Sequence, residues 1–322
     1  MKKIILLATG GTISTLEDKE SGGLKAKLGG EHLLKNITSQ VEVEVKNFST
    51  VNSTYLTPKD MFEMAKTIED LLKGDEVLGL VITHGTSTME ESAFFLDLLI
   101  QSTKPVVITG AQRQAGDMWP DGPHNLEMAI RVAASTAGVG KGVCVVFSNR
   151  IFRGRDIEKV HTTALDAFSS GDRGLLGFIY ADEVKFYQDN YRKTILLEEY
   201  QDVSVDIIKF YAGADGKFFE TAINAQVQGI VVEGVGLGNV NQFFYEGIKK
   251  ARAHGIEVVI ASRSPLGRVM PQYGYLGGGH SLEKLGVIFA EDLSSPKARL
   301  LLILALNMSK NTEEIKELFK MV

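Results

Sequence analysis

Short apolar runs recur along this chain and alternate with stretches that have the periodicity of amphipathic helices. In the first half each run closes on or just before a glycine, threonine, serine or asparagine, and the runs cover residues 4–8, 78–83, 106–109 and 143–148. The helical patterns between them cover residues 61–72, 92–101 and 125–137. This alternation predicts a parallel sheet with crossover helices. Because ligands of such open sheets bind beyond the carboxyl ends of the strands, functional residues are expected there.

The pattern loosens after residue 178, and a second series of strands and helices follows. Its expected strands cover residues 207–211, 229–233 and 258–262, and its closing helices cover residues 297–306 and 312–321. We therefore expect an α/β protein of two domains. A large N-terminal parallel α/β domain would cover residues 1–185, a linker residues 186–204, and a smaller C-terminal α/β domain residues 205–322.

The charge balance limits the classes of partner. Lys and Arg number 35 against 40 Asp and Glu, so the net charge is −5, and no cluster of basic residues is present. Binding to nucleic acid requires a basic surface that neutralises phosphates, so neither nucleic acid nor a membrane surface is expected as a partner. The longest apolar run, residues 300–306, is far shorter than the roughly 20 residues of a membrane-spanning helix.

Cys144 is the only cysteine. A single cysteine excludes an intrachain disulfide, a multi-cysteine zinc site and the two-thiol chemistry of amino-acid racemases. The apolar run at residues 4–8 is also shorter than the roughly 7–15 residues of a secretory signal. Both features favour a cytoplasmic location. No spacing of His, Asp and Glu is typical of a metal site, so no metal is expected.

The first expected strand ends in T-G-G-T-I at residues 9–13. The two glycines let the backbone approach a ligand, and the threonines expose hydroxyls on a loop. A dinucleotide site would need G-x-G-x-x-G and a P-loop would need Gly-Lys-Ser/Thr, and neither pattern is present. A nucleotide cofactor is therefore not expected, and a plain turn at the strand end is the alternative to a ligand site.

Further motifs rich in hydroxyls and charges follow the next strands. They read H-G-T-S-T-M-E-E at residues 84–91, T-G-A-Q-R at 109–113, D-G-P-H-N at 121–125 and R-D-I-E-K-V-H-T-T at 155–163. By itself the motif at residues 84–91 is also typical of a helix N-terminus, with Thr86 or Ser87 as the cap and Glu90 as a first-turn acid. His84 is expected to be a hydrogen-bonded structural residue at the end of its strand.

Together and in this order, these five motifs resemble those of the bacterial-type L-asparaginase/glutaminase family. G-V-G-L-G-N at residues 234–239 and S-R-S-P-L-G at 262–267 extend the resemblance over essentially the whole chain. The resemblance implies an asparaginase-like two-domain fold and a homodimer or homotetramer with active sites at a subunit interface. It also implies a hydrolase that acts on a side-chain amide, L-asparagine in the first place, and needs no metal or cofactor.

The resemblance also assigns catalytic roles. Thr12 is expected to attack the amide carbonyl, forming an acyl-threonine ester and releasing ammonia. Because a threonine hydroxyl is scarcely ionised at neutral pH, it needs a positioned base or a hydrogen-bonded relay. Thr86 and Lys159 resemble the family's second threonine and its lysine, where a partly desolvated lysine acts as a base. The alternative for Lys159 is a solvated surface lysine.

The resemblance also indicates which residues contact the substrate. Backbone N–H groups at the Thr86 turn and at Ala111 would stabilise negative charge on the carbonyl oxygen. Ser53 and Thr54 match the family position that binds the substrate's α-carboxylate, and Ser87 matches the position that contacts its α-ammonium. A turn or cap before the next helix is the alternative for Ser53 and Thr54.

The chain departs from the family at this last position. The family usually has aspartate where this chain has Ser87, and it commonly has a tyrosine in the loop that here covers residues 15–30, which contains none. Tyr55 and Trp119 add two large rings to the expected site. Three functions remain open: hydrolysis of L-asparagine, with another acid such as Asp117 or a neighbouring subunit supplying the countercharge; hydrolysis of a different amide or small carboxylate; and ligand binding without hydrolysis.

Overall fold

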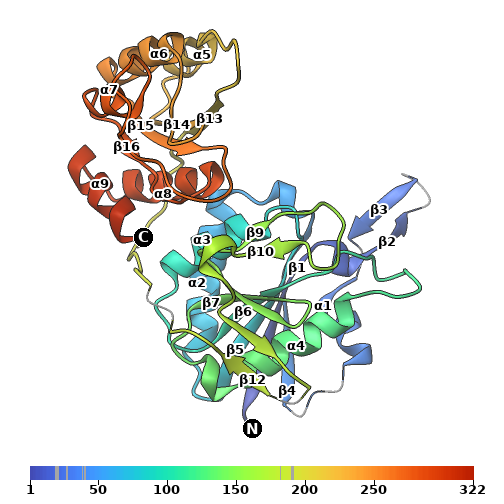
Figure 1. The fold of residues 1–322 in the computed structure, drawn as a ribbon. Helices are drawn as coiled ribbons and strands as arrows, with labels where there is room; N and C mark the ends of the chain where they lie inside the picture. The colour runs from blue at the N-terminus through green and yellow to red at the C-terminus, as the bar shows by residue number, and fades with distance from the viewer. Residues whose placement is uncertain (19–21, 27, 38, 40, 182, 190–191) are drawn as a thin grey trace. The chain divides into compact units, whose positions relative to one another are not determined.

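The computed structural model describes residues 1–18, 22–26, 28–37, 39, 41–181, 183–189 and 192–322. They form two compact units, Met1–Leu196 and Leu197–Val322 (Figure 1). Each unit contains its own sheet and helices, so the predicted two-domain α/β architecture is confirmed. The division between the units falls within the expected linker 186–204, whose exact boundaries stay a prediction.

The first unit is built on an eight-stranded sheet with the order β12-β11-β8-β7-β6-β5-β1-β4. The strands are β1 (Lys3–Gly10), β4 (Glu42–Val51), β5 (Val77–Thr83), β6 (Val106–Thr109), β7 (Val143–Phe147), β8 (Arg150–Arg153), β11 (Gly177–Ile179) and β12 (Val184–Phe186). From β4 to β7 neighbouring strands are parallel. The carboxyl ends of β1, β5 and β6 therefore meet at one edge of the sheet, as predicted. These strands are almost wholly buried, which explains their continuous apolar sequences.

The sheet is parallel from β4 to β7 and antiparallel beyond β7. β8, β11 and β12 each pair antiparallel with their neighbours. The cause is a tight hairpin after β7, where Ser148 and Asn149 have φ angles of 48° and 64°. Left-handed conformation at both central residues is what a two-residue hairpin turn requires. The expected strand 143–148 accordingly ends at Phe147.

The first unit contains four α-helices over its described residues, and the second of them begins at a side-chain cap. They are α1 (Gly30–Leu33), α2 (Pro58–Leu72), α3 (Met89–Leu99) and α4 (Gly122–Ala134). Before α2, the Thr57 hydroxyl accepts from the Asp60 N–H at 3.2 Å, and the Asp60 carboxylate accepts from the Thr57 N–H at 2.8 Å. This reciprocal capping box fixes the helix start that the sequence indicates. α4 begins earlier than expected and ends at Ala134, because residues 136–138 form a separate 3-10 turn.

Two small antiparallel pairs complete the first unit. β2 (Thr15–Asp18) pairs with β3 (Gly23–Ala26), and β9 (Glu158–Lys159) pairs with β10 (Phe168–Ser169). One hydrophobic core lies between the sheet and α4, with Leu6, Val81 and Val107 among its buried members. Burial of these side chains contributes hydrophobic stabilisation to the unit.

The second unit contains a four-stranded parallel sheet with the order β13-β14-β15-β16. Its elements are β13 (Val205–Lys209), α5 (Lys217–Asn224), β14 (Gly229–Gly234), α6 (Gln242–Ala253), β15 (Glu257–Ser262), α7 (Gly279–Glu283), β16 (Ile288–Phe289), α8 (Ser295–Asn307) and α9 (Thr312–Met321). The expected strands and closing helices are present, with β13 shifted by two residues toward the N-terminus. Among the helices described, none combines the length and hydrophobicity needed to cross a bilayer.

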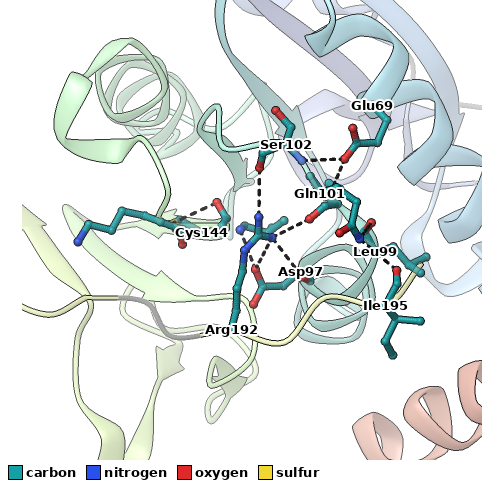
Figure 2. Close-up of polar contacts among 12 residues, drawn as sticks. Glu69, Asp97, Leu99, Gln101, Ser102, Cys144, Arg192 and Ile195 are labelled. Atoms are coloured by element: carbon teal, nitrogen blue, oxygen red, sulfur yellow. Dashed lines mark hydrogen bonds and ion pairs between the residues drawn. The ribbon is translucent and has the colours of Figure 1, made fainter. Parts of the chain in front are cut away.

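Arg192 ties the last residues of the first unit to the C-terminal end of α3 (Figure 2). Its guanidinium donates to the carbonyl oxygens of Asp97, Ile100 and Ser102 at 3.3, 2.9 and 3.1 Å. The Ile195 N–H donates to the Leu98 carbonyl in the same region. Carbonyls at a helix C-terminus lack intrahelical donors, so Arg192 satisfies groups that the helix itself leaves open.

The Asp97 carboxylate lies buried beside this guanidinium. One of its oxygens is 3.5 Å from an Arg192 nitrogen, and the same oxygen accepts from the Val143 N–H at 2.9 Å. Burial raises the pKa of Asp97 to about 6, while the Val143 N–H and the Arg192 charge act in the opposite direction. Removal of either side chain would therefore leave the other charge buried without a counter-charge.

Arg192→Ala is expected to lower the free energy of unfolding by about 3–5 kcal/mol at pH 7.5, because it leaves a buried carboxylate without its counter-charge. The loss should shrink toward pH 5, since Asp97 takes up a proton more readily in the folded state than in the unfolded state. Urea unfolding measures both effects. The control is Arg150→Ala, which breaks an exposed ion pair of 3.8 Å with Asp166 and should cost less than about 1 kcal/mol. Equal midpoints for the two variants would contradict this account.

Candidate active site

Two glycines at the end of β1 bring this strand end into direct backbone contact with the end of β4 and with the loop after β5. Gly10 and Gly11 have φ angles of 106° and 84°, which residues with a side chain rarely adopt. A Cβ on Gly10 would lie 2.5 Å from the Val51 carbonyl oxygen, and one on Gly11 would lie 2.4 Å from the Gly85 nitrogen. The loop that carries Thr12 is thus pressed against the loops that follow β4 and β5.

Side-chain hydroxyls lock the same three loops together. The Thr9 hydroxyl donates to the Thr83 carbonyl at 2.7 Å, which joins the ends of β1 and β5. The Thr88 hydroxyl donates to the Ser53 carbonyl at 2.9 Å, which joins the β5 and β4 loops. Ser53 also lies against Gly85, where a Cβ would be 2.6 Å from the Ser53 hydroxyl oxygen. The hydroxyl-rich composition of the motifs therefore has a structural role beside any chemical one.

Lys159 and Thr86 are in direct contact although 73 residues separate them in the chain. The Lys159 amine lies 2.8 Å from the Thr86 hydroxyl oxygen, and the Thr86 residue is 6% exposed. Burial lowers the pKa of Lys159, and the charge of Glu90 partly opposes this effect. Lys159 is therefore not the solvated surface lysine that the sequence left open, and its neutral form is more accessible than that of an ordinary lysine.

The loop after β6 is fixed by Asp121. Its carboxylate accepts from the N–H groups of Gln112 and Arg113 at 3.0 and 2.9 Å. Gly122, the next residue, lies against the loop after β1, since a Cβ there would be 2.7 Å from a carbon of the Ile13 side chain. The D-G-P-H-N motif thus joins the β6 loop to the segment that carries Thr12.

Asn125 completes this support from the first turn of α4. Its amide donates to the Gly110 carbonyl at 3.0 Å, and its carbonyl oxygen accepts from the Ser148 N–H at 3.1 Å. Within the described ranges, the backbone N–H groups of Thr86 and Ala111 have no protein acceptor. Both groups lie on loops held by the contacts above and can donate to a ligand oxygen, as stabilisation of an oxyanion requires.

The three expected substrate-binding hydroxyls differ in their surroundings. Ser53 is buried, and its hydroxyl has no hydrogen-bond partner among the described residues. Thr54 is exposed, and both its N–H and its hydroxyl donate to the Asn52 side chain at 3.2 Å. It therefore takes part in a turn, which the sequence left open as the alternative to a substrate-binding role. Ser87 is exposed on the turn before α3. Their contacts with a substrate stay predictions.

His84 is a structural residue, as expected. It is wholly buried at the end of β5, and its Nδ1 bonds the Gly85 carbonyl at 2.7 Å. Burial lowers the pKa of His84 to about 4, so the imidazole is neutral at pH 7. Within the described ranges no three His, Cys, Asp or Glu side chains gather where they could hold a metal ion.

Glu90 makes a contact that the sequence did not indicate. Its carboxylate accepts a hydrogen bond from the Lys159 N–H, so it holds the backbone of the lysine whose amine meets Thr86. The sequence showed only a first-turn acid, and no local pattern connects Glu90 with a strand 69 residues away. The two large rings expected near the site, Tyr55 and Trp119, are 76% and 73% exposed.

Asp117, the acid considered as a countercharge, is exposed, and its carboxylate accepts from the Trp119 N–H at 3.2 Å. Within the segment 15–30, the described residues 15–18 and 23–26 form the β2–β3 pair. Lys19 and Glu20, two of its charged residues, lie outside the described residues.

The chain matches known proteins over its whole length. Residues 3–192 match the asparaginase N-terminal domain, and residues 204–319 match the glutaminase/asparaginase C-terminal domain. The L-asparaginase of Bacillus licheniformis is 37% identical over 321 residues, with 99% of each chain covered. L-asparaginase 2 of Escherichia coli K12 is 34% identical over 338 residues, with 99% of this chain and 93% of that protein covered. The structure of a probable cytoplasmic L-asparaginase from Campylobacter jejuni is similar with a TM-score of 0.88, at 31% identity and 100% coverage of both chains.

Gly11→Ala is expected to lower the free energy of unfolding by at least about 3 kcal/mol, because the new methyl group meets the Gly85 backbone and the φ angle is unfavourable. Gly140→Ala is the matched control, since Gly140 has a φ of 75° and open space around its Cβ position. It should cost only about 1–2 kcal/mol. Urea unfolding of both variants gives the comparison, and equal costs would show that the loop contact is not tight.

Proposed function

This chain belongs to the asparaginase family, and from that premise we propose that it is an L-asparaginase-like amidohydrolase that converts L-asparagine to L-aspartate and ammonia. The observation that carries the proposal is the 2.8 Å contact between the Lys159 amine and the Thr86 hydroxyl. Thr86 belongs to the loop after β5, and Gly85 in this loop packs against Gly11. Gly11 directly precedes Thr12 in the chain. Lys159 has a lowered pKa and contacts the Thr86 hydroxyl, so this pair can accept a proton during acyl transfer to the hydroxyl of Thr12.

In the proposed first step the Thr12 hydroxyl oxygen attacks the carbonyl carbon of the substrate's side-chain amide. The N–H groups of Thr86 and Ala111 stabilise the negative charge that develops on the carbonyl oxygen, and loss of one such donor would cost roughly 3–4 kcal/mol. The carbon–nitrogen bond then breaks. The proton from the Thr12 hydroxyl leaves with the nitrogen as ammonia, and an acyl-threonine ester remains.

In the second step a water molecule attacks the ester. Lys159, through the Thr86 hydroxyl, accepts the proton of this water. The ester bond breaks, the carboxylic acid product forms, and the proton returns to the Thr12 oxygen. Ser53 and Thr54 would hold the substrate's α-carboxylate through hydroxyl and backbone donors during both steps.

Ser87 supports a second candidate function. A neutral hydroxyl cannot offset an ammonium charge, and removal of one member of a buried charged pair costs roughly 2–5 kcal/mol. The same threonine chemistry could therefore act on an amide or small carboxylate that lacks a free α-ammonium. A protein that binds such a ligand without hydrolysing it is the third candidate.

We also propose a cytoplasmic homodimer or homotetramer. The Campylobacter relative, described as cytoplasmic, supports the location. The family resemblance supports the assembly, in which a neighbouring subunit would complete the active site.

Thr12→Ala is expected to lower ammonia release from L-asparagine by at least about a thousandfold, because the nucleophile is removed. Release of ammonia at neutral pH is the measurement, and unchanged urea unfolding shows that the variant is folded. Thr67→Ala, the same substitution on α2 where the hydroxyl only bonds the Glu63 carbonyl, should keep full activity. Substantial turnover by Thr12→Ala would contradict the assigned nucleophile.

Ser87→Asp is expected to raise kcat/KM for L-asparagine at least about tenfold if the missing carboxylate limits this activity. Ser87→Asn matches the new side chain in size without its charge and should give no gain. For amides without the α-amino group the aspartate should give no gain either. A folded Ser87→Asp protein with unchanged activity on L-asparagine would exclude this explanation and favour the second candidate function.

A further inference from the structure

The turn before α3 and the first turn of α3 each contact Lys159. The Thr86 hydroxyl, on the turn that precedes the helix, contacts the Lys159 amine at 2.8 Å. The Glu90 carboxylate, one turn further on, accepts from the backbone N–H of the same lysine. One helix end thus contacts both the backbone and the side-chain end of Lys159.

The backbone of Lys159 has few other fixed points. β9 is only two residues long, and within the described residues it pairs only with β10. Val160 donates its N–H to the Ala167 carbonyl across this pair at 2.8 Å. Because successive N–H groups of a strand point in opposite directions, the Lys159 N–H points away from β10 and needs an acceptor elsewhere. Glu90 is that acceptor.

A lysine side chain has four rotatable bonds, so its amine reaches a given point reliably only if the backbone is held. We propose that Glu90 is a positioning residue for Lys159: its carboxylate fixes the β9 backbone on the first turn of α3 so that the lysine amine meets the Thr86 hydroxyl. This inference rests on the proposed function of Lys159 as a base, and it adds a residue for which the sequence indicated only a helix-capping charge.

The charged surroundings of Lys159 make this role measurable. α3 contributes Glu90 and Glu91 in its first turn, β9 itself contributes Glu158, and β10 contributes the uncharged Phe168 and Ser169. Of these groups, Glu90 is the one whose charge raises the pKa of Lys159. Glu90→Gln keeps an oxygen that can accept the hydrogen bond but removes the charge, whereas Glu90→Ala removes both.

The first experiment measures kcat and KM for L-asparagine across pH in the full-length protein. Glu90→Ala should lower kcat about 10- to 100-fold with less than about threefold change in KM, because the base is misplaced while the substrate still binds. Glu90→Gln should keep kcat within about threefold on the alkaline plateau. Its acidic limb should move about one pH unit lower, because Lys159 loses its proton more easily without the neighbouring negative charge.

Glu91→Gln is the matched control, since it removes the same charge from the same helix turn. It should leave kcat and the pH profile unchanged. An unchanged kcat in a folded Glu90→Ala protein overturns the proposal. So does an acidic limb that stays in place in Glu90→Gln or that moves equally in Glu91→Gln.

A second measurement does not depend on turnover. The rate at which trinitrobenzenesulfonate labels Lys159, followed by mass spectrometry of its peptide across pH, reports the ionisation of the amine. Glu90→Gln should lower the midpoint of this profile by about one pH unit, and Glu91→Gln should not. If the native protein releases no ammonia from any amide but this shift is present, the proposed function fails while the placement of Lys159 by Glu90 stands. If the midpoint does not move, the placement itself is wrong.

Discussion

The backbone contact between the loops after β1 and β5 is the constraint on which the rest of the site depends. Gly11 has no side chain, and its left-handed conformation lets it lie directly against Gly85. Any side chain here would push the Thr12 segment away from the turn that carries Thr86. The neighbouring contact of Gly10 with Val51 fixes the third loop in the same way. Three strand ends thus become one rigid edge.

α3 connects this edge to the end of the first unit. Its N-terminal turn follows Thr86 and carries Glu90, which holds the β9 backbone. Its C-terminal carbonyls are satisfied by Arg192, which also faces the buried Asp97 (Figure 2). The helix is therefore tied at both ends to distant parts of the chain, through its own Glu90 at the N-terminal end and through Arg192 at the C-terminal end. β9 is only two residues long, so its own strand pairing gives Lys159 little support. The bond from Glu90 supplies that support and fixes the position of the Lys159–Thr86 pair.

Much of the fold could be predicted from the sequence because buried parallel strands leave continuous apolar runs. Those runs located β1, β5, β6 and β7 closely, and the resemblance of the motifs identified the residues that gather at their ends. The hairpin after β7 was missed, because left-handed conformations at Ser148 and Asn149 depend on how the chain packs rather than on a glycine signal. Glu90 was missed since its partner is distant in sequence. Contacts of this kind are decided by tertiary structure.

Thr12 is proposed to carry the acyl group during amide hydrolysis, and rapid acid quenching can trap that group on the protein. The protein is mixed with L-asparagine, quenched within the first turnovers and digested, and its peptides are weighed by mass spectrometry. The account predicts an ester-linked acyl group on the peptide that contains Thr12. An acyl group on the peptide that contains Thr86, or ammonia release without any acylated peptide, would contradict it.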